Sequence, residues 1–146
     1  MRVKKHKPVQ TFPVMDGARR RHVPMATANV RYMTDDVPTA IDFYTKHLGF
    51  TLAQDSSPAF AAVKRDGLRL LLSGPTGSGR RPMPDGTGPV PGGWNRIEIV
   101  VDDLAAEVER LKEEGVAFRN DIVTGPGGSQ IVDDPFGNPI ELFQPA

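Results

Sequence analysis

The spacing of hydrophobic positions predicts a strand, a helix and three further strands in the first half of the chain. Residues 26–33 alternate like a strand, with Val30 and Tyr32 on one face and mainly polar side chains on the other. A helix then begins at the N-cap Asp36, because hydrophobic residues follow at helical spacing, and it ends at Gly49. Three strand-like segments come next, at 51–54, 59–64 and 68–72.

The same order of elements recurs in the second half. Residues 94–101 alternate with Ile97 and Ile99 on one face, and Asp103 caps a helix that ends at Gly115. The two caps, Asp36 and Asp103, stand 67 residues apart. Three strands can again follow, at 117–119, 129–133 and 139–144. The pattern therefore predicts two βαβββ modules, over residues 26–72 and 94–144.

A segment rich in glycine and proline separates the two predicted modules. Residues 73–93 contain seven glycines and five prolines, so no regular secondary structure is expected there. Arg80 and Arg81 in this segment either cover a site as a lid or keep the loop soluble. We interpret residues 25–146 as a single domain in which this segment links the modules.

Charge divides the chain into a basic start and an acidic body. Residues 1–24 hold seven of the 18 Lys and Arg side chains and one acid, and they show no hydrophobic periodicity. The other 122 residues hold 11 basic and 17 acidic side chains, a net charge of −6. We expect residues 1–24 to form a flexible basic extension. Such a tail can bind nucleic acid or acidic surfaces, and the favoured alternative is a tag remnant or a misplaced start, because Met25 directly precedes the ordered pattern.

The composition excludes several classes of protein. The chain has no cysteine, which rules out disulfides, thiolate metal sites and thiol nucleophiles. No hydrophobic run approaches the roughly 20 residues that a membrane helix requires. The basic start also lacks the hydrophobic core of a secretory signal. We expect a cytoplasmic protein that binds neither a membrane nor nucleic acid.

The last predicted strand carries a carboxylate whose role the pattern leaves open. Ile140 and Leu142 alternate with Glu141 and Phe143, so a packed core on one face places Glu141 on the other. That face either lines a cavity in which chemistry takes place or is simply exposed to water.

Three stretches of the chain resemble the vicinal oxygen chelate superfamily, which groups glyoxalase I, bleomycin-resistance proteins, fosfomycin-resistance enzymes and extradiol dioxygenases. They read DDVPTAIDFYTKHLGF, GGWNRIEIVVDDLAAEVERLKEEGV and DDPFGNPIELFQ, and the resemblance covers residues 26–144. It implies an α+β fold in which two βαβββ modules form a cup-shaped, mainly antiparallel half-barrel with the helices outside. It also implies a homodimer and a ligand or metal inside the cup.

The resemblance suggests a role for Glu141, because metal-dependent members carry a metal-ligating Glu at this place in the last strand. Their other ligands are usually a His at the start of each module's first strand, where this chain has Asn29 and Arg96. An amide oxygen is a weak ligand, and a guanidinium remains cationic and has no lone pair to donate. None of the three histidines of the chain lies on a predicted cup strand. We therefore expect neither a metal nor another cofactor.

A polar cup is predicted in place of the metal site. The candidate ligand-binding residues are Asn29, Arg31, Trp94, Arg96, Glu98, Glu141 and Phe143. An Arg beside a Glu there is either an internal ion pair or a clamp that receives a carboxylate, phosphate or carbonyl of a ligand. Trp94 and Phe143 are candidates for aromatic walls. No catalytic residue is assigned.

Two classes of function remain open from the sequence. The first is a metal-free protein that binds a small molecule for sequestration or resistance, as in the bleomycin-resistance branch. The acidic body favours a cationic ligand, whereas the arginines of the cup oppose one. The second is a lyase, isomerase or dioxygenase of the same superfamily that uses Glu141 or Glu98 as a general base, or an atypical metal site. Binding is favoured, because a neighbouring Arg lowers the pKa of a carboxylate away from the neutral range that a base needs.

Overall fold

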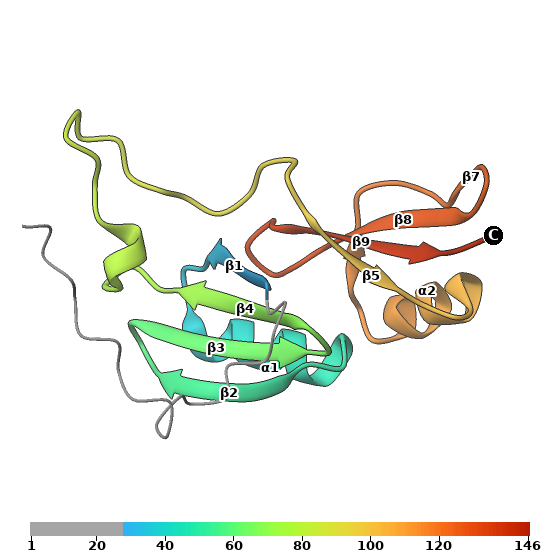
Figure 1. Cartoon of the computed structure of the whole chain (residues 1–146), viewed down its shortest axis with the longest axis horizontal. Coiled ribbons are helices and arrows are strands. Elements are labelled where there is room, and N and C mark those ends of the chain that lie inside the picture. Colours follow the sequence, from blue (N-terminus) through green and yellow to red (C-terminus); the bar gives the residue numbers. More distant parts are fainter. Residues whose placement is uncertain (1–27) are drawn as a thin grey trace, which may run out of the picture.

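Each half of the chain folds into a mixed sheet with one helix against one face (Figure 1). The computed structural model describes residues 28–146, so the basic extension predicted over residues 1–24 lies outside the described residues. The sheets do not close into a barrel, and the predicted α+β fold with two βαβββ modules is confirmed.

The first module contains five elements: β1 (Ala28–Met33), α1 (Val37–His47), β2 (Thr51–Ser56), β3 (Phe60–Arg65) and β4 (Leu68–Ser73). Its sheet has the order β1-β4-β3-β2, in which β1 and β4 run parallel and the other pairs are antiparallel. The side chain of Asp36 caps α1 by accepting a hydrogen bond from the Thr39 amide at 2.9 Å. Gly49 follows the helix with a φ of +70°, a conformation that glycine adopts without strain.

The second module repeats this plan with an additional short strand. Its elements are β5 (Ile97–Val100), α2 (Leu104–Glu113), β6 (Ala117–Phe118), β7 (Val123–Thr124), β8 (Gly128–Asp133) and β9 (Pro139–Gln144). The sheet has the order β5-β9-β8-β6, with β5 and β9 parallel, and β7 pairs with β8. Asp103 caps α2 through the Ala106 amide at 3.0 Å, which matches the cap of α1 and confirms the repeat.

Three local features differ from the sequence-based expectation. The strand predicted over 94–101 is confined to β5, because its pairing with β9 begins at Ile97. β7 is two residues long, too short for a periodic signal. The segment 73–93 contains the 3₁₀ turn η2 (Ser78–Arg80), so it is not wholly irregular.

The two modules share one hydrophobic core that lies between the sheets and their helices. Tyr44 and Leu72 from the first module and Ile140 and Leu142 from the second are all fully buried in it. A polar contact crosses the same region, because the hydroxyl of Tyr44 on α1 donates to Oδ2 of Asp134 at 2.7 Å. Within residues 28–146 neither helix is long and apolar enough to cross a membrane.

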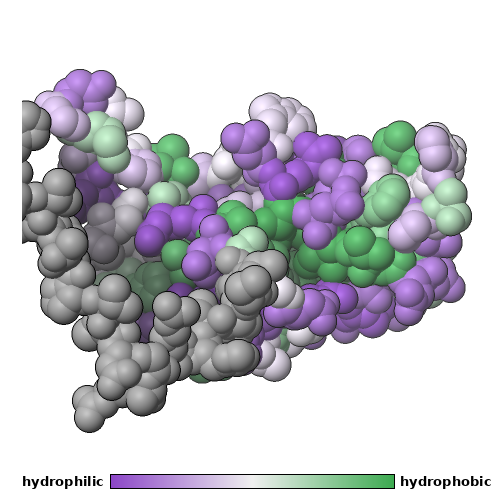
Figure 2. Space-filling view, viewed as in Figure 1, coloured by the Kyte–Doolittle hydropathy of each residue, from purple (hydrophilic) through white to green (hydrophobic). Residues whose placement is uncertain are grey.

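The faces of the two sheets that point away from the helices form what we call the cup face. Strand alternation places Arg31 and Ser73 on this face of the first sheet, and Glu98 and Glu141 on that of the second. Figure 2 shows hydrophobic surface gathered around β5 in the second module. Val100 of β5, on the same face as Glu98, is 57% exposed.

Candidate functional site

The cup face of the second module carries an ion pair between Arg96 and Glu141. Nε of Arg96 lies 2.9 Å from Oε2 of Glu141, and the two side chains are 32% and 19% exposed. β9 holds Glu141 between the buried Ile140 and Leu142, so its side chain points to the cup face. The predicted Arg–Glu neighbours are therefore these two residues, which stand 45 positions apart in the sequence.

Arg31 of β1 has a different partner. Its Nη1 donates to Oγ of Ser73 at 2.6 Å, across the parallel pair of β1 and β4. No carboxylate of residues 28–146 lies within 4.0 Å of its guanidinium. A Cβ on Gly79 would come within 2.5 Å of Nη1 of Arg31 and 2.7 Å of Oγ of Ser73. The η2 turn therefore leaves room for the guanidinium only because residue 79 is glycine.

Arg31 and Arg96 line one cavity between the two modules, which we call the seam cavity. It has a volume of about 350 Å³. Its lining consists of Val30, Arg31, Tyr32, Met33, Pro89, Val90, Gly92, Asn95, Arg96, Ile97 and Asn138. Four of these residues belong to β1, and Pro89, Val90, Gly92 and Asn95 belong to the connection between the modules. The cavity thus exists only where β1, the connection and the start of β5 meet.

Two buried polar side chains hold the walls of the seam cavity together. The hydroxyl of Tyr32 donates to the carbonyl of Pro139 at 2.6 Å and accepts from the amide of Ile97 at 3.0 Å, so it bridges the first residues of β5 and β9. Burial raises the pKa of Tyr32, which keeps the hydroxyl protonated and able to donate. Asn138 donates to the carbonyl of Met33 at 2.7 Å and accepts from the amide of Gly92 at 2.8 Å.

The other candidate residues do not converge on the seam cavity. Asn29 is exposed on β1, and the Cα partner of its position in the sheet is Arg69 of β4. Glu98 lies beside Glu141 in the register of β5 and β9 but lines a separate cavity of about 230 Å³. The ring of Phe143 packs against the backbone at Gly127, toward the outer end of the second module.

Trp94 does not form a wall of the seam cavity. It precedes β5, and 70% of its surface is exposed. The guanidinium of Arg119 lies 4.7 Å from the centre of its ring, a cation–π contact. Arg119 also donates to the carbonyls of Gly93 and Gly137, both at 2.8 Å. Arg119 thus links Trp94 to the end of the connection between the modules and to the turn before β9, and Trp94 is not among the residues that line the seam cavity.

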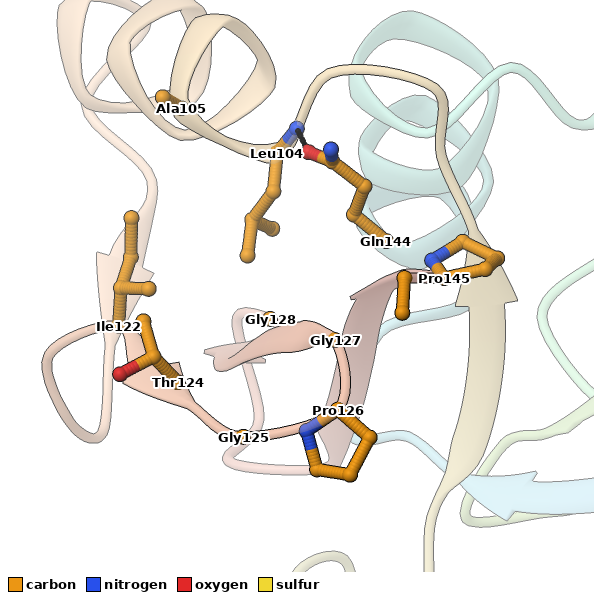
Figure 3. Close-up of a pocket in the computed structure, with 11 residues that line it drawn as sticks. Leu104, Ala105, Ile122, Thr124, Gly125, Pro126, Gly127, Gly128, Gln144 and Pro145 are labelled. Atoms are coloured by element: carbon orange, nitrogen blue, oxygen red, sulfur yellow. Dashed lines mark hydrogen bonds between the residues drawn. The ribbon is translucent and has the colours of Figure 1, made fainter.

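A cavity larger than the seam cavity lies elsewhere, at the outer end of the second module (Figure 3). It has a volume of about 460 Å³ and is bounded by the start of α2, the turn at 125–128 and the end of β9. The residues that line it include no charged side chain. Its longest polar side chain, Gln144, already accepts a hydrogen bond from the amide of Leu104 at 2.8 Å. This cavity holds none of the candidate residues from the sequence.

The residues at the cup do not suit a divalent metal. Within residues 28–146, no three His, Cys, Asp or Glu side chains are gathered closely enough to hold one. A metal bonded to a carboxylate oxygen lies about 2.0–2.6 Å from it. The guanidinium of Arg96 already occupies the space beside Oε2 of Glu141 at 2.9 Å, so its fixed positive charge opposes an ion there.

Several residues that line the seam cavity or position Arg31 in it carry no functional signal in the sequence. Ser73 and Gly79 lie at the start of a segment that reads as a linker, and Asn138 reads as part of a turn. Tyr32 is predicted on the core face, but its two hydrogen bonds reach residues 65 and 107 positions away. Hydrogen bonds over such separations depend on how the two modules pack, and strand alternation within one module does not report that.

Comparison with known proteins agrees with the fold and the sequence motifs. A model of the Glyoxalase/Bleomycin resistance protein/Dioxygenase superfamily matches residues 26–142, and the chain belongs to this superfamily. No functionally curated protein matches the chain.

Solved structures of the superfamily are similar to the chain over most of their length. A member from Sphaerobacter thermophilus DSM 20745 shares 26% identity, with a TM-score of 0.65 over 80% of this chain and 94% of that one. TnmS3, an antibiotic binding protein from Streptomyces sp. CB03234, shares 27% identity, with a TM-score of 0.62 over 87% and 100%. Lactoylglutathione lyase from Agrobacterium tumefaciens, at 22% identity and a TM-score of 0.66 over 83% and 94%, shares the fold.

Proposed function

We propose that this chain is a metal-free member of the superfamily that binds a small organic molecule and sequesters it. The observation that carries the proposal is the contact between Arg96 and Glu141 at 2.9 Å. It places a permanent cation beside the carboxylate that metal-dependent members use as a ligand. The similarity to TnmS3, an antibiotic binding protein, supports a binding role over catalysis.

The geometry also supports a role in binding because the pair of Arg96 and Glu141 is partly exposed. A fully buried ion pair between these residues would serve mainly to neutralise two charges. At 32% and 19% exposure, both side chains remain accessible to a molecule that enters the cup. Charge-assisted hydrogen bonds to such a molecule are stronger than neutral ones and fix its orientation.

The first test is the metal content of the full chain purified without added metal. We expect well under one equivalent of Ni, Zn, Mn or Fe by elemental analysis, and native mass spectrometry to report the same mass with and without a chelator. A stoichiometric metal that disappears in Glu141→Gln would contradict the proposal.

The second test separates Glu141 from a neighbouring carboxylate. Small molecules are screened by thermal shift, and the affinity of each hit is measured for Glu141→Gln and for the matched control Glu98→Gln. One lost charge-assisted hydrogen bond is worth about 1.5–3 kcal/mol, on the order of tenfold to 150-fold in affinity. We expect Glu141→Gln to weaken a cationic ligand or to strengthen an anionic one, and Glu98→Gln to have a smaller effect. Turnover of a hit, or equal effects of the two variants, would count against binding at this pair.

A further inference from the structure

We propose that the seam cavity is a site for small organic acids, in which Arg31 and Arg96 together receive the carboxylate of the ligand. This inference rests on the proposed function, because it assigns a chemical class to the molecule that the cup binds. It runs against the net charge of −6 outside residues 1–24, which by itself favours a cationic ligand.

The local charge of the cavity is positive although the body of the protein is acidic. Two arginines line the cavity, and none of its lining residues is an Asp or a Glu. Glu141 compensates Arg96, but Arg31 makes no salt bridge with any described residue and is held by the neutral hydroxyl of Ser73. A guanidinium without an acidic partner beside a concave surface attracts an anion over the short range at which salt does not screen it.

Both guanidiniums retain hydrogen-bond donors for a ligand. Arg31 uses Nη1 for Ser73, and no described residue accepts from its Nε or Nη2. Arg96 uses Nε for Glu141 and Nη1 for the carbonyl of Trp94 at 3.3 Å, and its Nη2 has no acceptor among residues 28–146. Because a guanidinium presents its N–H groups in a planar fork, these donors suit the two oxygens of a carboxylate.

The position of Arg31 is set by the η2 turn. Arg80 of this turn donates to the carbonyl of Thr34 at 2.8 Å, with a side chain that is only 12% exposed. This contact fixes the turn against the end of β1, and Gly79 then lies directly beside Nη1 of Arg31. The hydrogen bond to Ser73 and the close approach of Gly79 thus hold the Arg31 side chain in one position. An arginine present only for solubility needs no such contacts. Gly79 and Ser73 are positioning residues for it.

The remaining walls determine what accompanies the carboxylate. Val30, Met33, Pro89, Val90 and Ile97 supply apolar surface, and the volume of about 350 Å³ falls in the range of small-molecule sites. An inorganic anion would leave this apolar surface uncovered. The ligand class that fits is therefore a monocarboxylate with a compact hydrophobic body, for which benzoate is a suitable probe.

The test compares benzoate with benzamide, a neutral molecule of nearly the same shape, by NMR titration of the full chain at neutral pH and low salt. We expect benzoate to bind at least tenfold more tightly, with shifts at the side-chain Nε–H signals of Arg31 and Arg96. Arg31→Gln should remove most of this preference. The matched control Arg81→Gln, which removes the same charge from the exposed connection, should preserve it.

Gly79→Ala tests whether the position of the Arg31 side chain matters for binding, without removing the arginine. Its added Cβ must displace the guanidinium from Ser73, so benzoate affinity should fall severalfold while benzamide affinity and the melting temperature stay nearly constant. Equal binding of benzoate and benzamide, equal effects of Arg31→Gln and Arg81→Gln, or inorganic phosphate competing as strongly as benzoate would overturn the organic-acid assignment. Those results would leave the proposed function standing if another ligand responded to Glu141→Gln. Stoichiometric metal in the wild-type protein would instead overturn the proposed function, whatever the result with benzoate.

Discussion

The two tyrosines of this chain are both buried, and each bonds across the boundary between the modules. Tyr32 on β1 bridges Ile97 and Pro139, and Tyr44 on α1 donates to Asp134. Burial raises the pKa of both hydroxyls, and for Tyr44, whose pKa lies well above its usual value, the charge of Asp134 acts in the same direction. The hydrogen bonds of each tyrosine hydroxyl therefore form only when the two modules are packed together.

The alkaline titration of these tyrosines gives a prediction at the residue scale. In the unfolded chain each hydroxyl ionises near pH 10. The folded state has a higher pKa, so the stability that both protonated hydroxyls contribute is fully present below pH 10 and is lost as the pH rises above it. We expect the absorbance at 295 nm to stay flat through pH 10 and then to rise together with the loss of far-UV circular dichroism. A tyrosinate signal that rises at pH 10 with the fold intact would contradict the burial of these residues.

At the scale of elements, the contact between α1 and the turn from β8 to β9 joins the two modules. Asp134 in this turn accepts from Tyr44, from two backbone amides and from Asn138, and it is only 4% exposed. A buried carboxylate that loses one donor bears the cost of its desolvation. The turn also positions Asn138, which lines the seam cavity, so the stability of this contact affects the site.

Removal of the Tyr44 hydroxyl tests this contact. We expect Tyr44→Phe to lower the free energy of unfolding by about 1.5–3 kcal/mol in urea titration, because a hydrogen bond to a charged group is lost in the core. Thr45→Val is a matched control, since it removes a hydroxyl from the next residue of α1, which bonds only to the carbonyls of Ile41 and Asp42 in the same helix. Its effect should stay below about 1 kcal/mol. Similar decreases in the free energy of unfolding for Tyr44→Phe and Thr45→Val would show that the hydrogen bond between Tyr44 and Asp134 adds no stability of its own.

At the scale of the whole molecule, strands of both sheets leave hydrophobic side chains open to solvent. Val100 is 57% exposed on β5, and Leu52 is 47% exposed on β2, an edge strand whose six residues are all exposed. Unpaired sheet edges and exposed apolar side chains are features that a second copy of a chain covers in symmetric dimers. We therefore propose that the protein is a homodimer.

Light scattering checks the proposed dimer. We expect a mass of about twice 15.9 kDa at micromolar concentration, and we expect Val100→Glu to lower it toward the monomer by placing a charge in the interface. The exposed position of Val100 means that this substitution should change the circular dichroism spectrum little. A monomer mass for the unaltered chain would refute the dimer and leave the cup open to solvent on one side.

The amino-acid sequence by itself determined the modules and the direction of their side chains. Alternation placed Tyr32, Ile97 and Ile140 toward the core and Glu141 on the opposite face, and the helices begin at the predicted caps Asp36 and Asp103. These features follow from local physics, because strand period and capping involve residues within a few positions of one another. The superfamily model that matches residues 26–142 confirms the resemblance of these motifs to the superfamily.

Only the tertiary structure decided which of the polar residues meet. In the structure Arg96 pairs with Glu141, and Arg31 donates a hydrogen bond to Ser73. Trp94 does not line the seam cavity. The sequence left either arginine free to pair with either glutamate, because both arginines and both glutamates lie on the same predicted face. The choice depends on the register between strands far apart in the chain and on the path of the connection between modules. Those depend on the packing of the shared core, which no local pattern encodes.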